Sequence, residues 1–133
     1  MKLALAILAA TAALLTAQNA ITIRAGAYTA AQATAGEAAY RAACASCHGA
    51  DLEGHGQTPA LVGNEFLGEW KDLSVGVLFE KMQSSMPADK PGSLTQQRNA
   101  EILAFMLKRN GFPAGAIALP SDADALKKLA WGR

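Results

Sequence analysis

The chain has 133 residues, of which 51% are hydrophobic and 17% are charged, and its formal net charge is +1. This length is typical of one small domain. A charge so close to zero provides no strong basic field for nucleic acid or for an anionic membrane surface, and it leaves the chemistry of a docking partner undefined.

The first 27 residues have the pattern of an export signal. Lys2 supplies a minimal positive charge, and residues 3–15 are Leu, Ala and Ile apart from one Thr. This run is too short to span a bilayer and fits the apolar region of a signal peptide. We therefore predict a signal peptide at 1–27, a mature domain at 28–133 and a periplasmic location.

The cleavage site is open between positions 20 and 27. Ala25-Gly26-Ala27 obeys the small-x-small rule, whereas Ala20 lies nearer the apolar run but has Gln18 at the −3 position. An uncleaved membrane anchor is the alternative, because Ile21 and Ile23 lengthen the apolar segment. Cleavage after position 27 removes two of the 12 basic residues and none of the 11 acidic ones, so the net charge changes from +1 to −1.

An Ala-, Thr- and Gln-rich lead-in at 28–35 precedes the first predicted helix. Thr34 or Gly36 can start this helix, and Gly49 can end it. The residues that then recur at helical spacing are Tyr40, Ala43, Cys44 and Cys47. The helix therefore leads directly into residues 44–48.

Residues 44–48 form a Cys-x-x-Cys-His motif that holds both cysteines of the chain and one of its two histidines. In an exported chain this spacing is the attachment signature of a c-type haem. Cys44 and Cys47 on one helical turn can each add to one of the two vinyl groups on the same porphyrin edge. His48 then lies under the iron, where its imidazole can supply one axial ligand.

Three other interpretations of the motif are weaker. A thioredoxin-like redox pair needs a βαβ context, and no strand-like alternation flanks the motif. Zinc suits the ligand types of Cys44, Cys47, His48 and His55, but the usual long spacer before the histidines is missing. A structural disulfide in a secreted domain is the third alternative.

Residues 49–72 contain five glycines and one proline, Pro59, and we predict that they are irregular. A long loop without secondary structure is uncommon in a small domain unless it is functional. A loop that wraps a cofactor accounts for this one. The side chains expected to face the porphyrin are Leu61, Val62, Phe66 and Leu67.

Three further helices complete the predicted all-α fold of about four helices. The first follows a cap at Asp72 or Ser74 and ends before Pro87. The second runs from a cap at Thr95 to about residue 109, and the third is a short helix capped by Ser121. Leu126, Leu129 and Trp131 are expected to pack the chain end back, and no strand pattern appears.

The candidates for a second axial ligand are Met82, Met86, Met106 and His55. Met82 and Met106 lie on apolar helical stripes, where methionine usually fills a core. His55 lies between two glycines in a loop, where an exposed position is more usual. Met86 leaves a helix end before a proline that fixes the backbone, so its thioether is the favoured ligand.

At this point the sequence resembles the small monohaem class I cytochromes c over residues 34–120. The stretches that match are Tyr40-x-x-x-Cys44-x-x-Cys47-His48-Gly49, Pro59-Ala60-Leu61-Val62-Gly63, Trp70, Met86-Pro87, Gly92-Ser93-Leu94-Thr95, Ile102-x-x-Phe105-Met106 and Asn110-Gly111-Phe112-Pro113-Ala114-Gly115. One departure is Arg98, which occupies the place where the family often has the glutamate of a capping box.

The resemblance implies a role for several residues. Cys44 and Cys47 would carry the thioethers of one covalent haem c, with His48 and Met86 as axial ligands. Pro59 would accept a hydrogen bond from the His48 ring through its carbonyl oxygen. Trp70 would lie near a haem propionate through its ring N–H.

The function expected from a haem iron with both axial positions filled is one-electron transfer, without an enzymatic activity of its own. The partners would be redox proteins, either a donor dehydrogenase or an acceptor oxidase. One alternative is a haem subunit of a periplasmic dehydrogenase or oxidase complex. Another is a haem enzyme or gas-binding protein in which Met86 dissociates from the iron.

Overall fold

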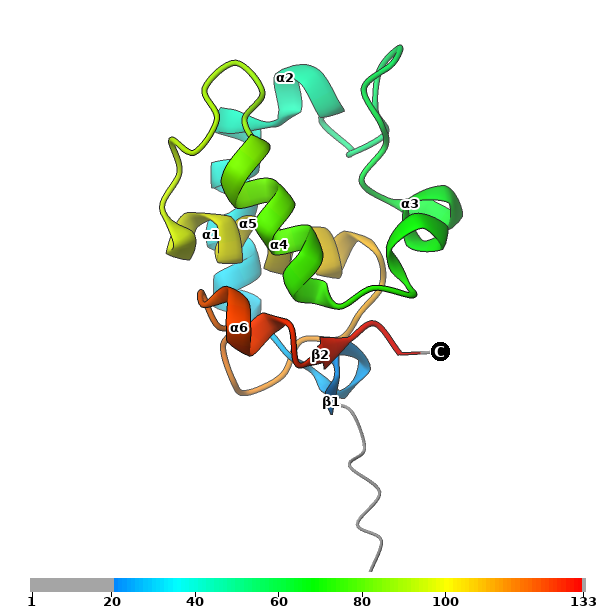
Figure 1. Ribbon diagram of the computed structural model, residues 1–133, viewed down its shortest axis with the longest axis vertical. Helices are drawn as coiled ribbons and strands as arrows, with labels where there is room; N and C mark the ends of the chain where they lie inside the picture. The colour runs from blue at the N-terminus through cyan, green and yellow to red at the C-terminus, as the bar shows by residue number, and fades with distance from the viewer. Residues whose placement is uncertain (1–20, 133) are drawn as a thin grey trace, which may run out of the picture.

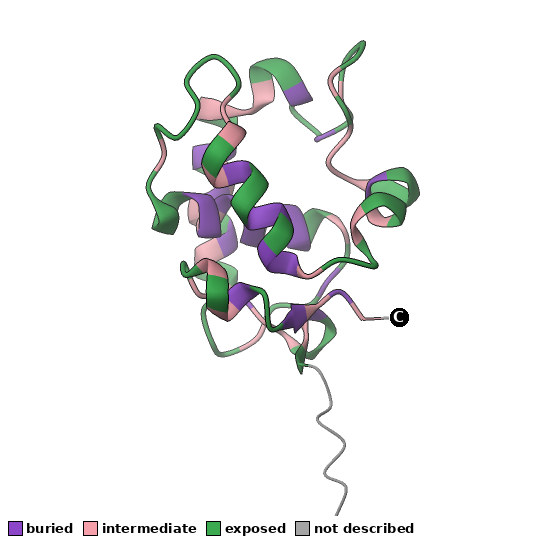
Figure 2. Ribbon diagram, viewed as in Figure 1, coloured by how far each residue is buried: buried purple, intermediate pink, exposed green. Residues whose placement is uncertain are grey.

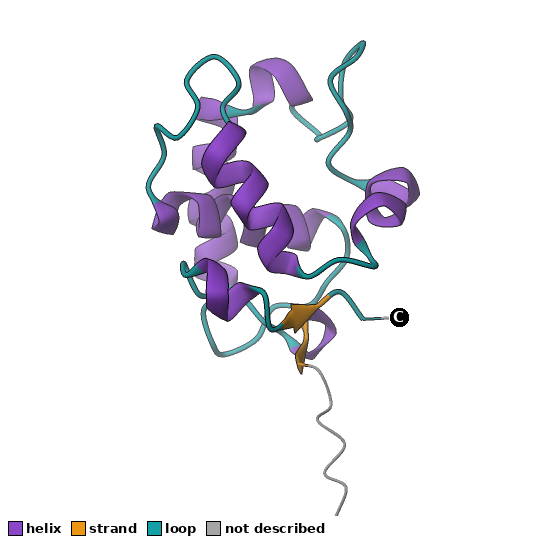
Figure 3. Cartoon of the chain, in the orientation of Figure 1, coloured by secondary structure: helices purple, strands orange, loops and turns teal. Residues whose placement is uncertain are grey.

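The computed structural model describes residues 21–132, and the apolar run at 3–15 lies outside this range. Within residues 21–132 the chain forms six α-helices, one 3-10 helix and two short strands. Their bounds are β1 (Ile21–Thr22), a 3-10 helix (Ile23–Ala25), α1 (Ala30–Ala43), α2 (Ala45–His48), α3 (Gly63–Trp70), α4 (Val75–Ser85), α5 (Gln96–Arg109), α6 (Ala123–Leu126) and β2 (Leu129–Ala130). The mostly helical chain confirms the predicted all-α class (Figure 3).

Helices α1, α4 and α5 pack together, and α3 stands apart from them at the far end of a long loop (Figure 1). Gly36 lies where α1 crosses α5, because a Cβ at this position would collide with the backbone carbonyl oxygen of Glu101. The rings of Tyr40 and Phe105 pack across the same crossing with centroids 5.4 Å apart. A glycine inside a helix costs about 1 kcal/mol relative to alanine, and the burial that this close approach allows offsets the cost.

The predicted start of the first helix at Thr34 or Gly36 is wrong. Helix α1 begins at Ala30, because the Thr29 hydroxyl caps it by accepting a hydrogen bond from the Gln32 N–H at 3.2 Å. The lead-in at 28–35 is rich in alanine, the strongest helix former, and needs only this cap to become helical.

Helices α4 and α5 agree with the predicted segments. Ser74 occupies the N-cap position of α4, which ends before Met86-Pro87. The Thr95 hydroxyl caps α5 by accepting from the Arg98 N–H at 3.1 Å. The cap therefore forms although Arg98 replaces the glutamate of a capping box.

The prediction that residues 49–72 are irregular throughout is wrong for α3. Gly63 and Gly68 suggested a break, but the helix continues through Gly68 to Trp70, and open space surrounds a Cβ placed at Gly68. Phe66 is only 4% exposed, and its burial stabilises the helix against the low helix propensity of glycine. Most other residues of α3 are exposed (Figure 2).

The two ends of the described chain meet in a strand pair that the sequence did not predict. Strands β1 and β2 are parallel, with Ile21 opposite Leu129 and Thr22 opposite Ala130. Pairs of two residues leave no alternating pattern to detect. Ile23, in the next turn, is fully buried.

The last helix, α6, is capped by Asp122 instead of the predicted Ser121, because the Asp122 carboxylate accepts from the Ala125 N–H at 2.9 Å. Leu126, Leu129 and Trp131 are buried, as predicted. Trp131 packs on Phe66 of α3 with ring centroids 6.1 Å apart. The C-terminal segment therefore holds α3 to the rest of the domain. Within residues 21–132, no helix is both long enough and apolar enough to cross a membrane.

Candidate functional site

Cys44 and Cys47 lie at the junction of α1 and α2. The predicted single helix is divided at Cys44, whose φ of −124° departs from helical geometry. The next turn closes again when the His48 N–H donates to the Cys44 carbonyl at 2.9 Å. Both thiols are free; Cys44 is half-buried and Cys47 is exposed. Burial, and secondly the nearby Cys47, raises the pKa of the Cys44 thiol to about 11.

His48 ends this turn with its ring held by the segment that follows. The distance from His48 Nδ1 to the Pro59 carbonyl oxygen is 2.9 Å. Since a carbonyl oxygen only accepts, Nδ1 carries the proton and donates it, which leaves the Nε2 lone pair available. We name residues 49–62, which carry this carbonyl, the proximal segment.

The proximal segment is folded back on itself. The Gly54 N–H donates to the His48 carbonyl at 2.7 Å, and the Leu61 N–H donates to the Leu52 carbonyl at 2.8 Å. His55 and Thr58 exchange a pair of backbone hydrogen bonds at 3.0 and 2.9 Å. Such bonds leave the His55 side chain exposed at the tip of the segment, as expected for a loop histidine.

Met86 is the C-cap residue of α4 and begins what we name the distal segment, residues 86–95. Its side chain is half-buried, whereas Met82 and Met106 are 7% and 2% exposed and belong to the hydrophobic core. Of these three methionines, Met86 alone therefore lies outside the helices, at the C-terminal end of α4.

Leu61, Val62, Leu67 and Trp70 are half-buried and pack against the core. Trp70 contacts Phe66 with ring centroids 6.3 Å apart. The indole Nε1 of Trp131, which also packs on Phe66, is buried without a hydrogen-bond partner among the described residues.

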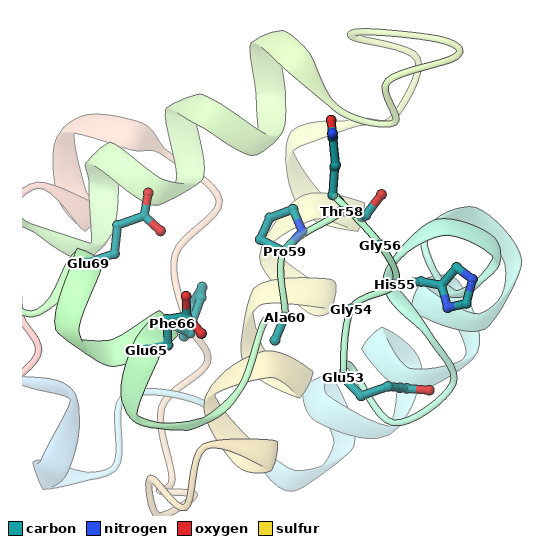
Figure 4. Close-up of a pocket in the computed structure, with 11 residues that line it drawn as sticks. Glu53, Gly54, His55, Gly56, Thr58, Pro59, Ala60, Glu65, Phe66 and Glu69 are labelled. Carbon is teal, nitrogen blue, oxygen red and sulfur yellow. The ribbon is translucent and has the colours of Figure 1, made fainter.

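A cavity of about 430 Å³ separates the proximal segment from α3. In Figure 4, Pro59 and Ala60 face the helix that carries Glu65, Phe66 and Glu69, while the His55 side chain points away from it. The cavity adjoins Pro59 but is not lined by the two cysteines, His48 or Met86. Sequence reasoning missed its acidic wall, because the i,i+4 spacing of Glu65 and Glu69 has meaning only if 63–70 is helical.

The donor set fits a covalent haem better than the alternatives. Two free thiols share one turn with an imidazole whose Nδ1 is already bonded, so that only Nε2 can coordinate a metal. In residues 21–132 no three His, Cys, Asp or Glu side chains are placed to hold a metal ion, which argues against the zinc interpretation. In the part of the chain that the structure describes, the elements next to the motif are helices and not the strands that a thioredoxin-like pair requires.

A Cys-x-x-Cys-His turn on an all-α fold of this kind defines a c-type cytochrome domain. The chain belongs to the family described as cytochrome c oxidase, cbb3-type, subunit III, whose model matches residues 31–106. Membership confirms the resemblance to c-type cytochromes predicted from the sequence. It also gives electron transfer as the class of function and implies a covalent haem c.

A similar protein is the fructose dehydrogenase cytochrome subunit of Gluconobacter japonicus, which is 34% identical over 113 residues. That alignment covers 74% of this chain but only 22% of the relative, so the chain spans about a fifth of the relative's length. The fold is similar to a chain in the crystal structure of the sulfane dehydrogenase SoxCD from Paracoccus pantotrophus. The TM-score is 0.53 at 22% identity, over 97% of this chain and 68% of the other.

Proposed function

We propose that this chain carries single electrons through a haem c attached to Cys44 and Cys47, with His48 and Met86 as axial ligands. The observation that carries the proposal is the hydrogen bond of 2.9 Å between His48 Nδ1 and the Pro59 carbonyl. It fixes the tautomer and the ring orientation that an axial histidine needs.

When bound, the haem supplies an iron that cycles between two oxidation states. The protein's part is to hold two ligands in place so that little rearranges when the charge changes. Pro59 makes the His48 imidazole a stronger donor to a metal because its carbonyl accepts a hydrogen bond from the Nδ1–H. The Met86 thioether favours the reduced state and raises the potential. Leu61 would line the porphyrin, and Trp70 would donate its ring N–H to a propionate.

Two methionine variants of the haem-loaded protein test the ligand assignment. Met86→Leu should abolish the far-red absorption band that arises from sulfur–iron(III) ligation, because leucine replaces the thioether at similar volume. Met82→Leu, one helical turn earlier in α4, is the matched control and should keep the band. A wild-type protein that is high-spin at rest and binds carbon monoxide readily would overturn the carrier proposal in favour of a haem enzyme or gas-binding protein.

The second candidate function is a haem subunit of a periplasmic dehydrogenase or oxidase complex, favoured by the similarity to a cytochrome subunit of fructose dehydrogenase. The same haem would then pass electrons from a catalytic partner to an acceptor, and this chain would itself catalyse no substrate conversion. Affinity purification of the tagged chain from its own cells distinguishes the two. A stoichiometric redox enzyme in the eluate supports the subunit, and a chain that elutes alone at monomer size supports the free carrier.

We also propose export to the periplasm, with the leader ending before Ile21 instead of after Ala27. Cleavage after Ala27 would remove strand β1 and the fully buried Ile23. It would also remove Gly26, where a Cβ would lie 2.9 Å from the Gly115 Cα, so this turn is closely packed. The intact mass of the haem-loaded protein checks this: a chain starting at Ile21 supports it, and one starting at Tyr28 or retaining residues 1–20 overturns it.

A further inference from the structure

The side chain of Asn110 connects the end of α5 to the proximal segment. Its Nδ2 donates to the Leu61 carbonyl and to the Met106 carbonyl, both at 2.9 Å. Its Oδ1 accepts from the Gly63 N–H at 3.1 Å. Both amide protons and one acceptor position are therefore used, and two of the three partners lie almost fifty residues earlier in the chain.

Two of these partners, the Leu61 carbonyl and the Gly63 N–H, are backbone groups that local structure leaves free. Gly63 is the first residue of α3, whose N-cap residue Val62 makes no side-chain capping bond. The first N–H groups of a helix have no partner within it, so Asn110 supplies one from a distant helix. The Met106 carbonyl, near the end of α5, accepts from the Asn110 backbone N–H at 3.0 Å and also from Asn110 Nδ2, so one side chain bonds the ends of two helices.

Leu61 is consequently fixed from both sides. Its N–H donates to the Leu52 carbonyl at 2.8 Å, and its carbonyl accepts from Asn110. Pro59 lies only two residues before Leu61, and the Pro59 carbonyl is the group that accepts the hydrogen bond from Nδ1 of His48. The Asp51–Arg109 ion pair also joins α5 to this segment, but it is exposed and such pairs contribute little.

We propose that Asn110 is a positioning residue for the axial imidazole: by holding Leu61 and Gly63, it keeps the Pro59 carbonyl on His48 and so tunes the reduction potential. This inference rests on the proposed ligation by His48. A purely structural C-cap role would need only the bond to Met106. The bonds to Leu61 and Gly63 belong to the proximal segment instead.

The test compares Asn110→Ala with wild type in the haem-loaded protein, using the reduction potential and the exchange rate of the His48 Nδ1 proton in the reduced state. We expect the potential to rise, because a weaker bond to Pro59 makes the imidazole a poorer donor. We expect the proton to exchange about tenfold faster, since the bond opens more often.

Two controls separate positioning from general destabilisation. Leu126→Ala removes a fully buried side chain in α6 and should lower the free energy of unfolding without changing either readout. Asn64→Ala removes an exposed amide beside Gly63 and should change nothing. If Asn110→Ala does not accumulate, Asn110→Ser takes its place in the test. The shorter serine side chain cannot make hydrogen bonds to Leu61 and to Gly63 at the same time.

The outcomes also separate this inference from the proposed function. Suppose that the wild-type protein is low-spin and ligated by histidine, and that both Asn110 variants have the same reduction potential and proton exchange rate as wild type. This result would overturn the role of Asn110 alone. Equal shifts in Leu126→Ala would overturn it too. A wild type without histidine ligation would instead overturn the proposed function.

Discussion

The proximal and distal segments both lack regular structure, yet they are held very differently. The proximal segment is bonded to α2 through Gly54, to itself through Leu61 and to α5 through Asn110. The distal segment has turn bonds within itself, such as Lys90 N–H to the Pro87 carbonyl at 2.9 Å. Among the described residues its side-chain bonds to helices are the Thr95 cap of α5 and the bond from Gln83 Nε2 to the Leu94 carbonyl at 3.2 Å.

This difference shows that the absence of helix or strand is a poor measure of order. Bonds to distant elements immobilise the proximal segment, while residues 88–93 of the distal segment are exposed and rest on local turns. Local stability follows the density of such contacts. The histidine side of the proposed site is therefore built to stay fixed, and the methionine side is free to open first.

The largest expected effect comes from removing the ligand on the fixed side. His48→Ala should abolish most haem-loaded protein, because the imidazole is both the proposed ligand and the group that bonds Pro59. Met86→Ala should keep its covalent haem and become high-spin. Haem absorbance per mole of purified protein measures both; equal yields of the two variants would contradict the asymmetry.

Amide hydrogen exchange gives the next largest contrast. The amides of Gly54 and Leu61 should exchange on the order of a hundredfold more slowly than those of Lys90 and Ser93, because opening the proximal segment breaks bonds to other elements. Residue-resolved exchange of the haem-loaded protein provides the measurement. Similar rates in the two segments would show that local turns suffice to hold the distal one.

Gln83→Ala should sharpen the comparison by loosening the distal segment further. It removes the bond to Leu94 and leaves Nδ2 of Asn99, a residue only 2% exposed, without its acceptor at 2.9 Å. An unsatisfied buried donor costs about 1–3 kcal/mol, which chemical denaturation will detect. Gln97→Ala, on the exposed face of α5, is the control. An equal loss of unfolding free energy in this variant would show that the effect of Gln83→Ala is not specific to its bonds with Leu94 and Asn99.

The smallest effect concerns Tyr40, whose hydroxyl donates to the Gly49 carbonyl at 2.7 Å at the start of the proximal segment. Burial is the main cause that raises the pKa of Tyr40 above its ordinary value of 10.0. Its contribution to stability is therefore complete below pH 10 and is lost as the pH rises through the raised pKa.

Tyr40→Phe should accordingly be less stable than wild type by about 1 kcal/mol at pH 7, through the lost hydrogen bond. The gap in unfolding free energy should narrow above pH 10, as wild type loses the contribution that phenylalanine never had. Denaturation at a series of pH values measures it. A gap that stays constant up to pH 12 would show that the hydroxyl does not titrate with unfolding.

The sequence predicted those features that local patterns encode. The motif at 44–48, the end of α4 before Pro87 and the cap at Thr95 each depend on neighbours within a few positions. Helix α3 was not predicted because the burial of Phe66, a tertiary effect, outweighs the low helix propensity of its two glycines. The bonds of Asn110 were not predicted because its partners Leu61 and Gly63 are distant in sequence. In addition, Asn-Gly after a helix is already explained locally as a signal that ends the helix.

The parallel pairing of β1 with β2 bears on the order of events during biogenesis. Almost the whole described chain lies between Ile21 and Leu129, so this pairing has a very high contact order and cannot form before residues 129 and 130 have been synthesised. Trp131, which packs on α3, arrives later still. A chain that stops short of Leu129 therefore already contains the turn with Cys44 and Cys47 but still lacks the strand pair that joins its two ends.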